Sequence, residues 1–172
     1  MRVLGIDLAA KADNPTGFAT WSGGVIECWS EPADDRRVLR LATRARVVVI
    51  DAPLTPSDGP FRRRDERFRE LAPVLPLTLP GMRKLLRRGV RLAERLRRRG
   101  VRVYETFPRA AERRLSLRGE WSDEHARDAA LCCGVGVAIV EGWAETFGRE
   151  PRAALPGRRG TLRVRARSAP PS

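Results

Sequence analysis

Residues 46–53 read RVVVIDAP, a run of β-branched residues that ends in an acid and a proline. Such a run is typical of a strand that is buried on both faces of a parallel sheet. Residues 2–9 read RVLGIDLA and have the same apolar character, again with an acid inside the run. The sequence therefore predicts two buried strands, each of which carries an aspartate, Asp7 and Asp51.

The residues between these two runs predict an antiparallel meander followed by a helix. Residues 16–21 and 25–29 are β-prone, and they flank a Ser-Gly-Gly sequence whose glycines can adopt the positive φ of a tight hairpin. Residues 34–42 have the pattern of a short helix. The predicted order up to Asp51 is thus three antiparallel strands, a helix and a fourth strand.

Further along the chain, two helices and a strand are predicted. Apolar residues recur at helical spacing over residues 82–99, with basic side chains on the opposite side. Residues 101–104 form a strand that ends at Glu105, and Ser122 is a suitable N-cap for a helix that runs to about residue 147. Residues 161–164 are a candidate edge strand.

The order of these elements predicts a single α/β domain over residues 1–165. We expect a mixed five-stranded sheet, in which a three-strand antiparallel meander is joined by two parallel strands, with flanking helices. The proline- and arginine-rich residues 52–80 are expected to form a loop insertion, and residues 166–172 a disordered tail. The helix over 122–147 is apolar on both sides, so the tail or a partner subunit in a homodimer must cover it.

Composition and motifs exclude several classes of protein. The chain of 172 residues has one histidine, His125, and three cysteines without a CxxC pair, so neither a two-histidine metalloprotease nor a structural zinc site is expected. It has no GxSxG, P-loop or GxGxxG motif. Its longest charge-free apolar run, residues 129–140, is far shorter than the roughly 20 residues of a membrane span. Because Asp7 also interrupts any signal-peptide pattern, we expect a cytoplasmic protein with no membrane association.

The basic charge is concentrated in the middle of the chain. The formal net charge is +13, and residues 61–118 carry the largest basic excess. A segment this basic favours a polyanionic partner, of which nucleic acid is the commonest; the alternative is a solvated arginine surface. Asp65 is expected to act as a salt-bridge partner of the arginines around it. The candidate nucleic-acid-binding residues are Arg62, Arg63, Arg64, Arg67, Lys84, Arg87, Arg88, Arg91, Arg95 and Arg98.

Four carboxylates occupy positions where burial without a partner would be costly. Asp7 lies inside the first strand, Asp51 and Glu105 end apolar strands, and Asp128 lies on an apolar helix. Because ligand sites gather at the carboxyl ends of parallel strands, these acids are expected to converge and to hold Mg²⁺ or Mn²⁺, which prefer oxygen ligands. Taken singly, Asp51 could cap a turn, Glu105 could pair with an arginine, and Asp128 could pair with Arg127 or Arg91.

Several short motifs resemble a domain-of-unknown-function family described as predicted RNase H-like nucleases. The resemblance covers residues 2 to about 165 and rests on Gly5-Ile6-Asp7-Leu8, Thr16-Gly17-Phe18-Ala19, Ile50-Asp51-Ala52-Pro53-Leu54, Arg64-Asp65, Tyr104-Glu105-Thr106-Phe107-Pro108 and Asp128-Ala129-Ala130-Leu131. It implies the RNase H-like fold, shared with Holliday-junction resolvases, in which acids on strand one, strand four and a late helix bind two metal ions. The matching positions are Asp7, Asp51 and Asp128, with Glu105 as a fourth candidate.

These observations predict a metal-dependent nuclease of DNA or RNA that uses two Mg²⁺ or Mn²⁺ ions. One alternative is a catalytically inactive nucleic-acid-binding protein that keeps a vestigial acidic site. Another is a phosphotransferase, because residues 5–7 and 16–17 also resemble the phosphate-binding start of the actin and sugar-kinase fold. The chain is too short for the two-domain cleft of that fold, which places this alternative last.

Overall fold

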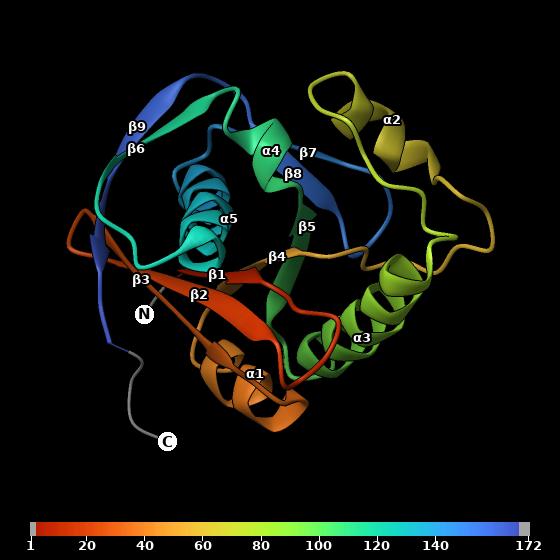
Figure 1. Cartoon of the computed structure of the whole chain (residues 1–172). Coiled ribbons are helices and arrows are strands. Elements are labelled where there is room, and N and C mark those ends of the chain that lie inside the picture. Colours follow the sequence, from red (N-terminus) through yellow and green to blue (C-terminus); the bar gives the residue numbers. More distant parts are fainter. Residues whose placement is uncertain (1–2, 169–172) are drawn as a thin grey trace.

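The computed structural model describes residues 3–168, which form five helices and nine strands (Figure 1). The helices are α1 (Asp35–Ala42), α2 (Arg63–Arg69), α3 (Pro80–Arg97), α4 (Pro108–Ala111) and α5 (Glu124–Val140). The strands are β1 (Val3–Asp7), β2 (Pro15–Ser22), β3 (Val25–Pro32), β4 (Val47–Asp51), β5 (Arg102–Thr106), β6 (Leu115–Gly119), β7 (Ala144–Phe147), β8 (Ala153–Pro156) and β9 (Gly160–Ala166). Among the described residues, no helix is long and apolar enough to cross a membrane.

All nine strands belong to one mixed sheet in the order β6-β9-β3-β2-β1-β4-β5-β8-β7. Strands β1, β2 and β3 pair antiparallel, and β1, β4 and β5 pair parallel. The five strands expected from the sequence are therefore neighbours in the middle of the sheet. The sheet is larger than expected, because β6 and β9 extend it at one edge and β8 and β7 extend it at the other. Strand β9 was expected at an edge, but it lies between β3 and β6.

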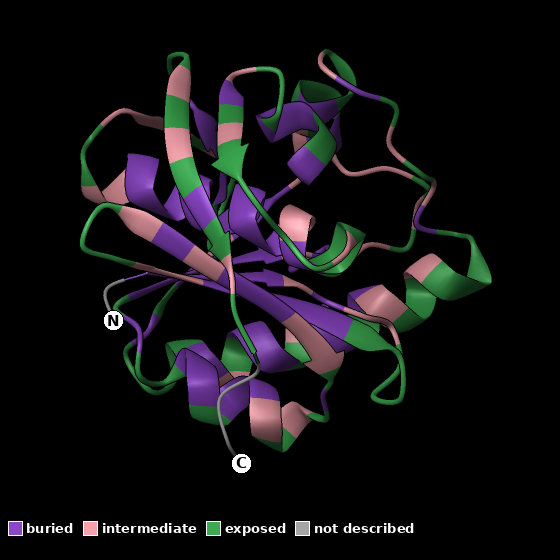
Figure 2. Ribbon diagram, turned by 60° about the vertical axis from the view of Figure 1, so that its left-hand side comes forward, coloured by how far each residue is buried: buried purple, intermediate pink, exposed green. Residues whose placement is uncertain are grey.

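Side chains alternate between the two faces of the central strands, and each face packs on different helices. Leu4 of β1 and Val48 of β4 lie in one apolar core with residues of α1 and α3, including Leu92. Val3 and Val49 lie on the other face, against α5. Figure 2 shows the helices below the sheet with buried sides toward it and exposed sides outward. The central strands are thus covered on both faces, as their sequences require.

Helix α5 is enclosed by the sheet, which curls around it (Figure 1). It contacts β1, β2, β3 and β4 on one side and also packs against α4 and β6 to β9. The cover that the sequence required is therefore supplied by this chain's own later strands, so the helix needs no partner subunit for that purpose. The helix ends at Val140 rather than near residue 147, because residues 144–147 form β7. Its N-cap is Asp123, whose carboxylate accepts the Ala126 amide, and not Ser122.

Two expectations about irregular segments need correction. Residues 52–80 contain α2, so they are not one continuous loop. Ala166, expected in the tail, is the last residue of β9, and Arg167 donates to Glu27 and stacks on Trp29. Residues 169–172 of the expected tail lie outside the described part of the chain.

Arg88 is buried, although helical periodicity placed it on the solvent face of α3. Only 5% of the residue is exposed. Its guanidinium pairs with Asp35 of α1 at 2.9 Å and donates to the carbonyl oxygens of Ala9 and Ala33. Every partner comes from outside α3, so no pattern within that helix could reveal them. Arg88 therefore ties α3 to α1 and to the loops after β1 and β3.

We predict that Arg88→Met destabilises the fold by about 3 kcal/mol, because it leaves Asp35 and two carbonyl groups without their donor. The neighbouring Arg87 is exposed, and Arg87→Met should change stability by no more than about 0.5 kcal/mol. Urea denaturation of the two variants measures both values. Equal stability of the two variants would show that the Arg88 contacts contribute nothing.

Candidate functional site

Asp7 and Asp51 are the last residues of two adjacent parallel strands. They are paired in register, Asp7 opposite Asp51, so their side chains point to the same face of the sheet. That face is the one covered by α5, because Val3 and Gly5 on β1 share it with Asp7. The two strands therefore present neighbouring carboxylates at their carboxyl ends. The sequence predicted that these acids converge, but it placed Asp7 inside its strand rather than at the last residue.

Asp128 of α5 faces the same place from the helix side. Burial raises the pKa of its carboxyl to about 6, and the charge of Asp7 contributes to this increase. Arg127 pairs with Asp128 at 3.2 Å and opposes the shift. The local pairing with Arg127 that the sequence allowed is therefore present, and it coexists with the approach to Asp7.

The three carboxylates disfavour one another's charge. Burial raises the pKa of Asp51 well above its ordinary value, and the charges of Asp7 and Asp128 raise it further. Burial also raises the pKa of Asp7, against the effect of a neighbouring histidine. Three acids in this situation form a centre that a cation or a proton would stabilise.

His125 belongs to this centre and was missed as a site residue. Its Nδ1 lies 2.7 Å from Oδ2 of Asp7, and its side chain is 48% exposed. It lies three residues before Asp128, a spacing that places both side chains on the same side of α5. That spacing was the available signal, but pairing with Asp7 depends on how α5 packs on β1.

Glu105 does not join the other acids. In the parallel pairing of β4 and β5, Thr106 lies opposite Asp51, whereas Glu105 lies opposite Ile50. An offset of one residue reverses the face, so Glu105 leaves the strand on the opposite side. Its carboxylate accepts hydrogen bonds from Arg62, from Arg64 and from the amide of Leu54. The expectation that Glu105 is a metal ligand is therefore wrong, and the alternative of pairing with an arginine is what the structure has.

The basic residues proposed for nucleic-acid contact divide into two groups. Arg62 and Arg64 are turned inward onto the buried Glu105, and Arg88 is turned inward onto the partly buried Asp35, so none of the three can serve as a surface. Arg62 also pairs with the buried Asp65, which confirms the salt-bridge reading of that acid. In the second group, Arg95 is partly buried and the other six residues are exposed: Arg63, Arg67, Lys84, Arg87, Arg91 and Arg98.

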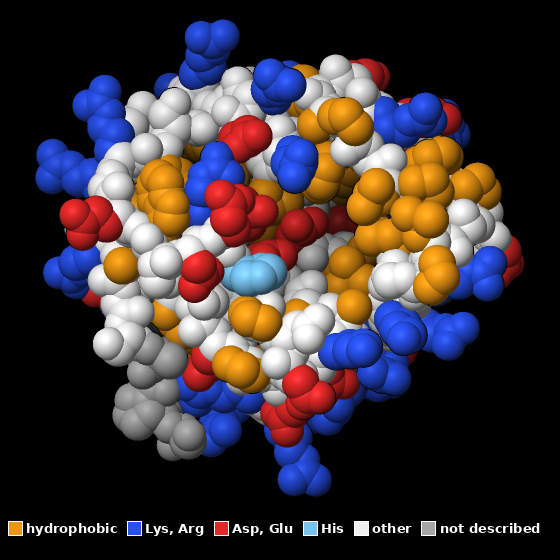
Figure 3. Space-filling model, viewed as in Figure 1, with side chains coloured by type: hydrophobic (Ala, Val, Ile, Leu, Met, Phe, Trp, Pro, Cys, Tyr) orange, Lys and Arg blue, Asp and Glu red, His pale blue; other side chains and the backbone are white. Residues whose placement is uncertain are grey.

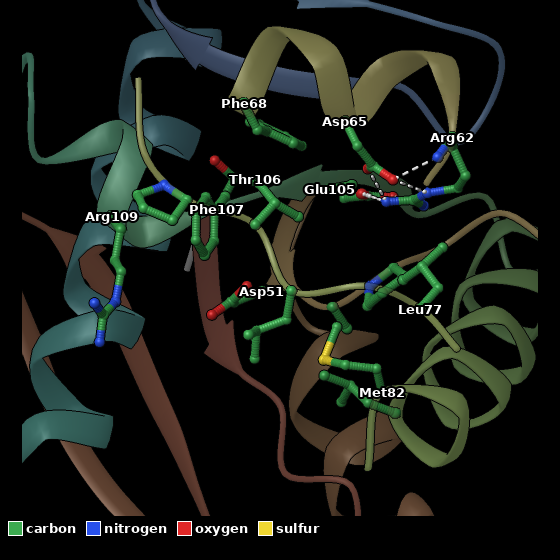
Figure 4. Close-up of a pocket in the computed structure, with 16 residues that line it drawn as sticks. Asp51, Arg62, Asp65, Phe68, Leu77, Met82, Glu105, Thr106, Phe107 and Arg109 are labelled. Carbon is green, nitrogen blue, oxygen red and sulfur yellow. Dashed lines mark hydrogen bonds and ion pairs between the residues drawn. The ribbon is translucent and has the colours of Figure 1, made fainter. Parts of the chain in front are cut away.

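Arg109 is a basic residue near the three aspartates that was not expected from the sequence. Arg109, on α4, is exposed and lowers the pKa of Asp51. Among the described residues it forms no hydrogen bond or ion pair, unlike Arg62 and Arg64. Figure 4 shows Arg109 and Asp51 among the residues that line one pocket. Arg109 is thus a free positive charge beside a group of acids.

The donors suit a hard divalent cation, but they are not gathered into a closed site. Asp7, Asp51 and Asp128 offer only oxygen atoms, which Mg²⁺ and Mn²⁺ prefer. Within residues 3–168, no three side chains of His, Cys, Asp or Glu form a group that could hold a metal ion. Burial is the main cause of the raised pKa of all three carboxyls, so a cation bound among them would stabilise their charged forms.

The carboxylates border a hollow in the surface. Figure 3 shows acidic side chains beside the chain's only histidine, with the hollow continuing into an apolar surface. A pocket of about 380 Å³ lies there and includes Asp51 and Arg109 in its lining. Of the three aspartates, Asp51 is the one that lines this pocket, so a ligand in the pocket can reach it from outside.

Comparisons of the chain with protein-family models, with curated proteins and with solved structures found no match. The geometry of this site is therefore what bears on the function of the chain.

We predict that Asp128 titrates near pH 6, as the raised pKa indicates. Because the folded state then binds this proton more tightly than the unfolded chain, the contribution of Asp128 to stability is largest at acidic pH. It is lost as the pH rises from about 4 to 6. Carboxyl-carbon NMR measures the pKa. Asp7→Asn should lower it, since the Asp7 charge disappears, whereas Asp13→Asn, in an exposed loop, should not. An unchanged pKa in Asp7→Asn would contradict the coupling.

Proposed function

We propose that the protein is a metal-dependent nuclease with an RNase H-like fold, whose active site is formed by Asp7, Asp51 and Asp128. The observation that carries the proposal is the in-register placement of Asp7 and Asp51 on adjacent parallel strands, with Asp128 facing them from α5. Acids that are partly buried and raise one another's pKa reduce stability, and such groups are concentrated at functional sites. The central order β3-β2-β1-β4-β5 agrees with the resemblance to RNase H-like nucleases.

The three aspartates would hold the divalent cations through their carboxylate oxygens. When bound, Mg²⁺ or Mn²⁺ lowers the pKa of water and stabilises the negative charge on the leaving oxygen of a phosphodiester. Glu105 is excluded from this role by its contacts with Arg62 and Arg64. The ligand set of this chain is therefore three aspartates rather than four acids.

His125 positions Asp7 and offers a site for proton transfer. Its Nδ1 is engaged with Asp7, which leaves Nε2 as the ring nitrogen that can exchange a proton with substrate or solvent. Arg109, beside Asp51 and free of partners among the described residues, can orient the phosphate by direct ion pairing. Both residues lie at the edge of the hollow, where they can meet a substrate.

The exposed basic residues of α3 supply a surface for the phosphate backbone. Arg83, Arg87 and Arg91 follow one another at intervals of four residues and line one groove of about 520 Å³. Residues at this spacing lie on the same side of a helix and are about 6 Å apart along its axis. Such contacts bind and orient nucleic acid without reading its sequence.

A nucleic-acid-binding protein with a vestigial site is the second candidate. It is favoured by the absence, among the described residues, of three ligands grouped to hold a metal ion. The two candidates share the basic surface of α3 and differ only in whether the aspartates act. Metal-dependent cleavage therefore distinguishes them.

We predict that cleavage of oligonucleotides requires Mn²⁺ or Mg²⁺ and falls at least about 100-fold in Asp51→Asn, because the amide keeps the shape and loses the charge that binds the cation. Asp7→Asn and Asp128→Asn should behave alike. In the absence of metal, Asp51→Asn should be more stable than the wild type by about 1–3 kcal/mol, since a repelled, buried charge has been removed.

Asp13→Asn is the matched control, because Asp13 is exposed and its charge does not contribute to the raised pKa of any of the three aspartates. It should cleave like the wild type. Thermal melting should show stabilisation by Mn²⁺ in the wild type and in Asp13→Asn, but not in Asp51→Asn. Metal-dependent cutting that all the variants share would argue against the site, and stabilisation without cutting would support the vestigial alternative.

We also predict that binding of nucleic acid weakens log-linearly with salt, with a slope of about −0.9 for each phosphate neutralised on a duplex. Reversing Arg83, Arg87 and Arg91 to glutamate should weaken binding and make the slope shallower. The matched control reverses Arg36, Arg40 and Arg44, which are also exposed and also four residues apart. Fluorescence anisotropy at several salt concentrations measures both. Equal effects of the two triple variants would show that only net charge matters.

A further inference from the structure

The pocket beside the carboxylates has an apolar wall that the chemistry of cleavage does not use. It lies between α2, the start of α3 and the segments that follow β4 and β5 (Figure 4). Its polar lining comprises Asp51, Thr106 and Arg109 and also Arg62, Asp65 and Glu105, whose charges are paired with one another. Its apolar lining includes Pro53, Phe68, Leu75, Leu77, Met82 and Phe107. Because Arg62, Asp65 and Glu105 neutralise one another, a ligand that fills the pocket needs an apolar body and a charged or polar group that reaches Asp51 and Arg109.

The rim of this pocket exposes apolar surface to solvent. Leu75 is 61% exposed, the largest value among the exposed large apolar residues of the described chain. Figure 3 shows this apolar patch directly beside the acidic hollow. Exposed apolar surface next to a polar centre is typical of a binding site.

Helix α3 joins the apolar pocket to the basic groove. Met82 and Leu85 of its first turns line the pocket, while Arg83, Arg87 and Arg91 line the neighbouring groove. A ligand that follows this helix thus meets positive charge outside and apolar surface inside. This pairing of surfaces complements a polyanion that carries flat apolar groups on its chain.

We propose that the pocket receives one nucleobase of an unpaired nucleotide, whose phosphate lies at Asp7, Asp51 and Asp128. This rests on the proposed nuclease function and specifies its substrate as single-stranded, or locally unpaired, nucleic acid. The bases are the extended apolar parts of a nucleic acid, and in a duplex they are stacked inside. A base must leave the stack to enter a pocket. Contact of a base with aromatic and apolar side chains then favours the unpaired strand whatever its sequence.

The test measures binding of fluorescein-labelled oligodeoxynucleotides and oligoribonucleotides by anisotropy, with Ca²⁺ added so that the three aspartates hold a cation to which the phosphate can bind. Three forms of each are compared: a single strand, the same strand with abasic positions, and the duplex. The single strand should bind about tenfold more tightly than its abasic form, because the base contact is lost. Cleavage in Mn²⁺ is measured in parallel, with Asp51→Asn as the inactive reference.

Leu75→Ala and Leu79→Ala are the matched variants. Both leucines are exposed, but only Leu75 lines the pocket. Leu75→Ala should reduce the advantage of the intact strand over the abasic strand by about threefold or more, and Leu79→Ala should leave it unchanged. Because Leu75 is exposed, its truncation should preserve the fold, and the comparison of two oligonucleotides within one variant does not depend on stability.

The outcomes separate this inference from the proposed function. Equal binding of intact, abasic and duplex forms, with cleavage still abolished by Asp51→Asn, would overturn the base pocket and leave the nuclease. An advantage of the intact strand that Leu75→Ala does not reduce would place the base elsewhere and also overturn the pocket. Failure of the wild type to bind or cut any oligonucleotide would overturn both.

Discussion

The close approach of α5 to β1 and β2 is the constraint on which the site depends. A Cβ atom at Gly5 would lie 2.2 Å from the carbonyl oxygen of Ala129, and one at Gly17 would lie 1.9 Å from that of His125. Any side chain at either position would push the first half of α5 away from the sheet. Because glycine has no side chain at these two positions, the helix can approach the sheet closely. This approach brings His125 into contact with Asp7 and places Asp128 near Asp51.

The chain treats its two groups of buried acids differently. Glu105 and Asp65 receive Arg62 and Arg64, so their charges are neutralised inside the protein. Within residues 3–168, no arginine forms an ion pair with Asp51, although the chain carries 34 basic residues. Burying an unpaired charge costs several kcal/mol, and placing three carboxylates together adds to that cost. In a chain this basic, the lack of a buried guanidinium at Asp51 favours a centre whose positive charge comes from outside.

The predictability of each site residue follows from how local its determinants are. Asp7 and Asp51 could be placed together because each lies in an apolar run typical of a buried parallel strand, and parallel pairing of the two strands brings them into register. The prediction that Glu105 joins the other acids did not hold, because the face on which its side chain lies depends on the register between β4 and β5. A difference of one residue moves the side chain to the opposite face of the sheet. The prediction that Arg88 lies on the solvent face of α3 was wrong because its partners come from α1 and from two loops. Strands β6 to β9 were largely missed because they are short and gain their burial from curling around α5, which no local pattern records.

The buried ion network also explains why a pocket exists beside the carboxylates. Helix α2 is short and contributes only Phe68 to the apolar core, so apolar packing alone would hold it weakly over the strand ends. Arg62 bridges Asp65 on this helix to Glu105 on β5, and Arg64 reaches the carbonyl oxygens of Arg149 and Pro151. These contacts fix α2 at a distance from α3 that leaves space between them. Glu105 is thus excluded from the acidic centre, yet it helps to hold in place the wall against which a substrate would lie.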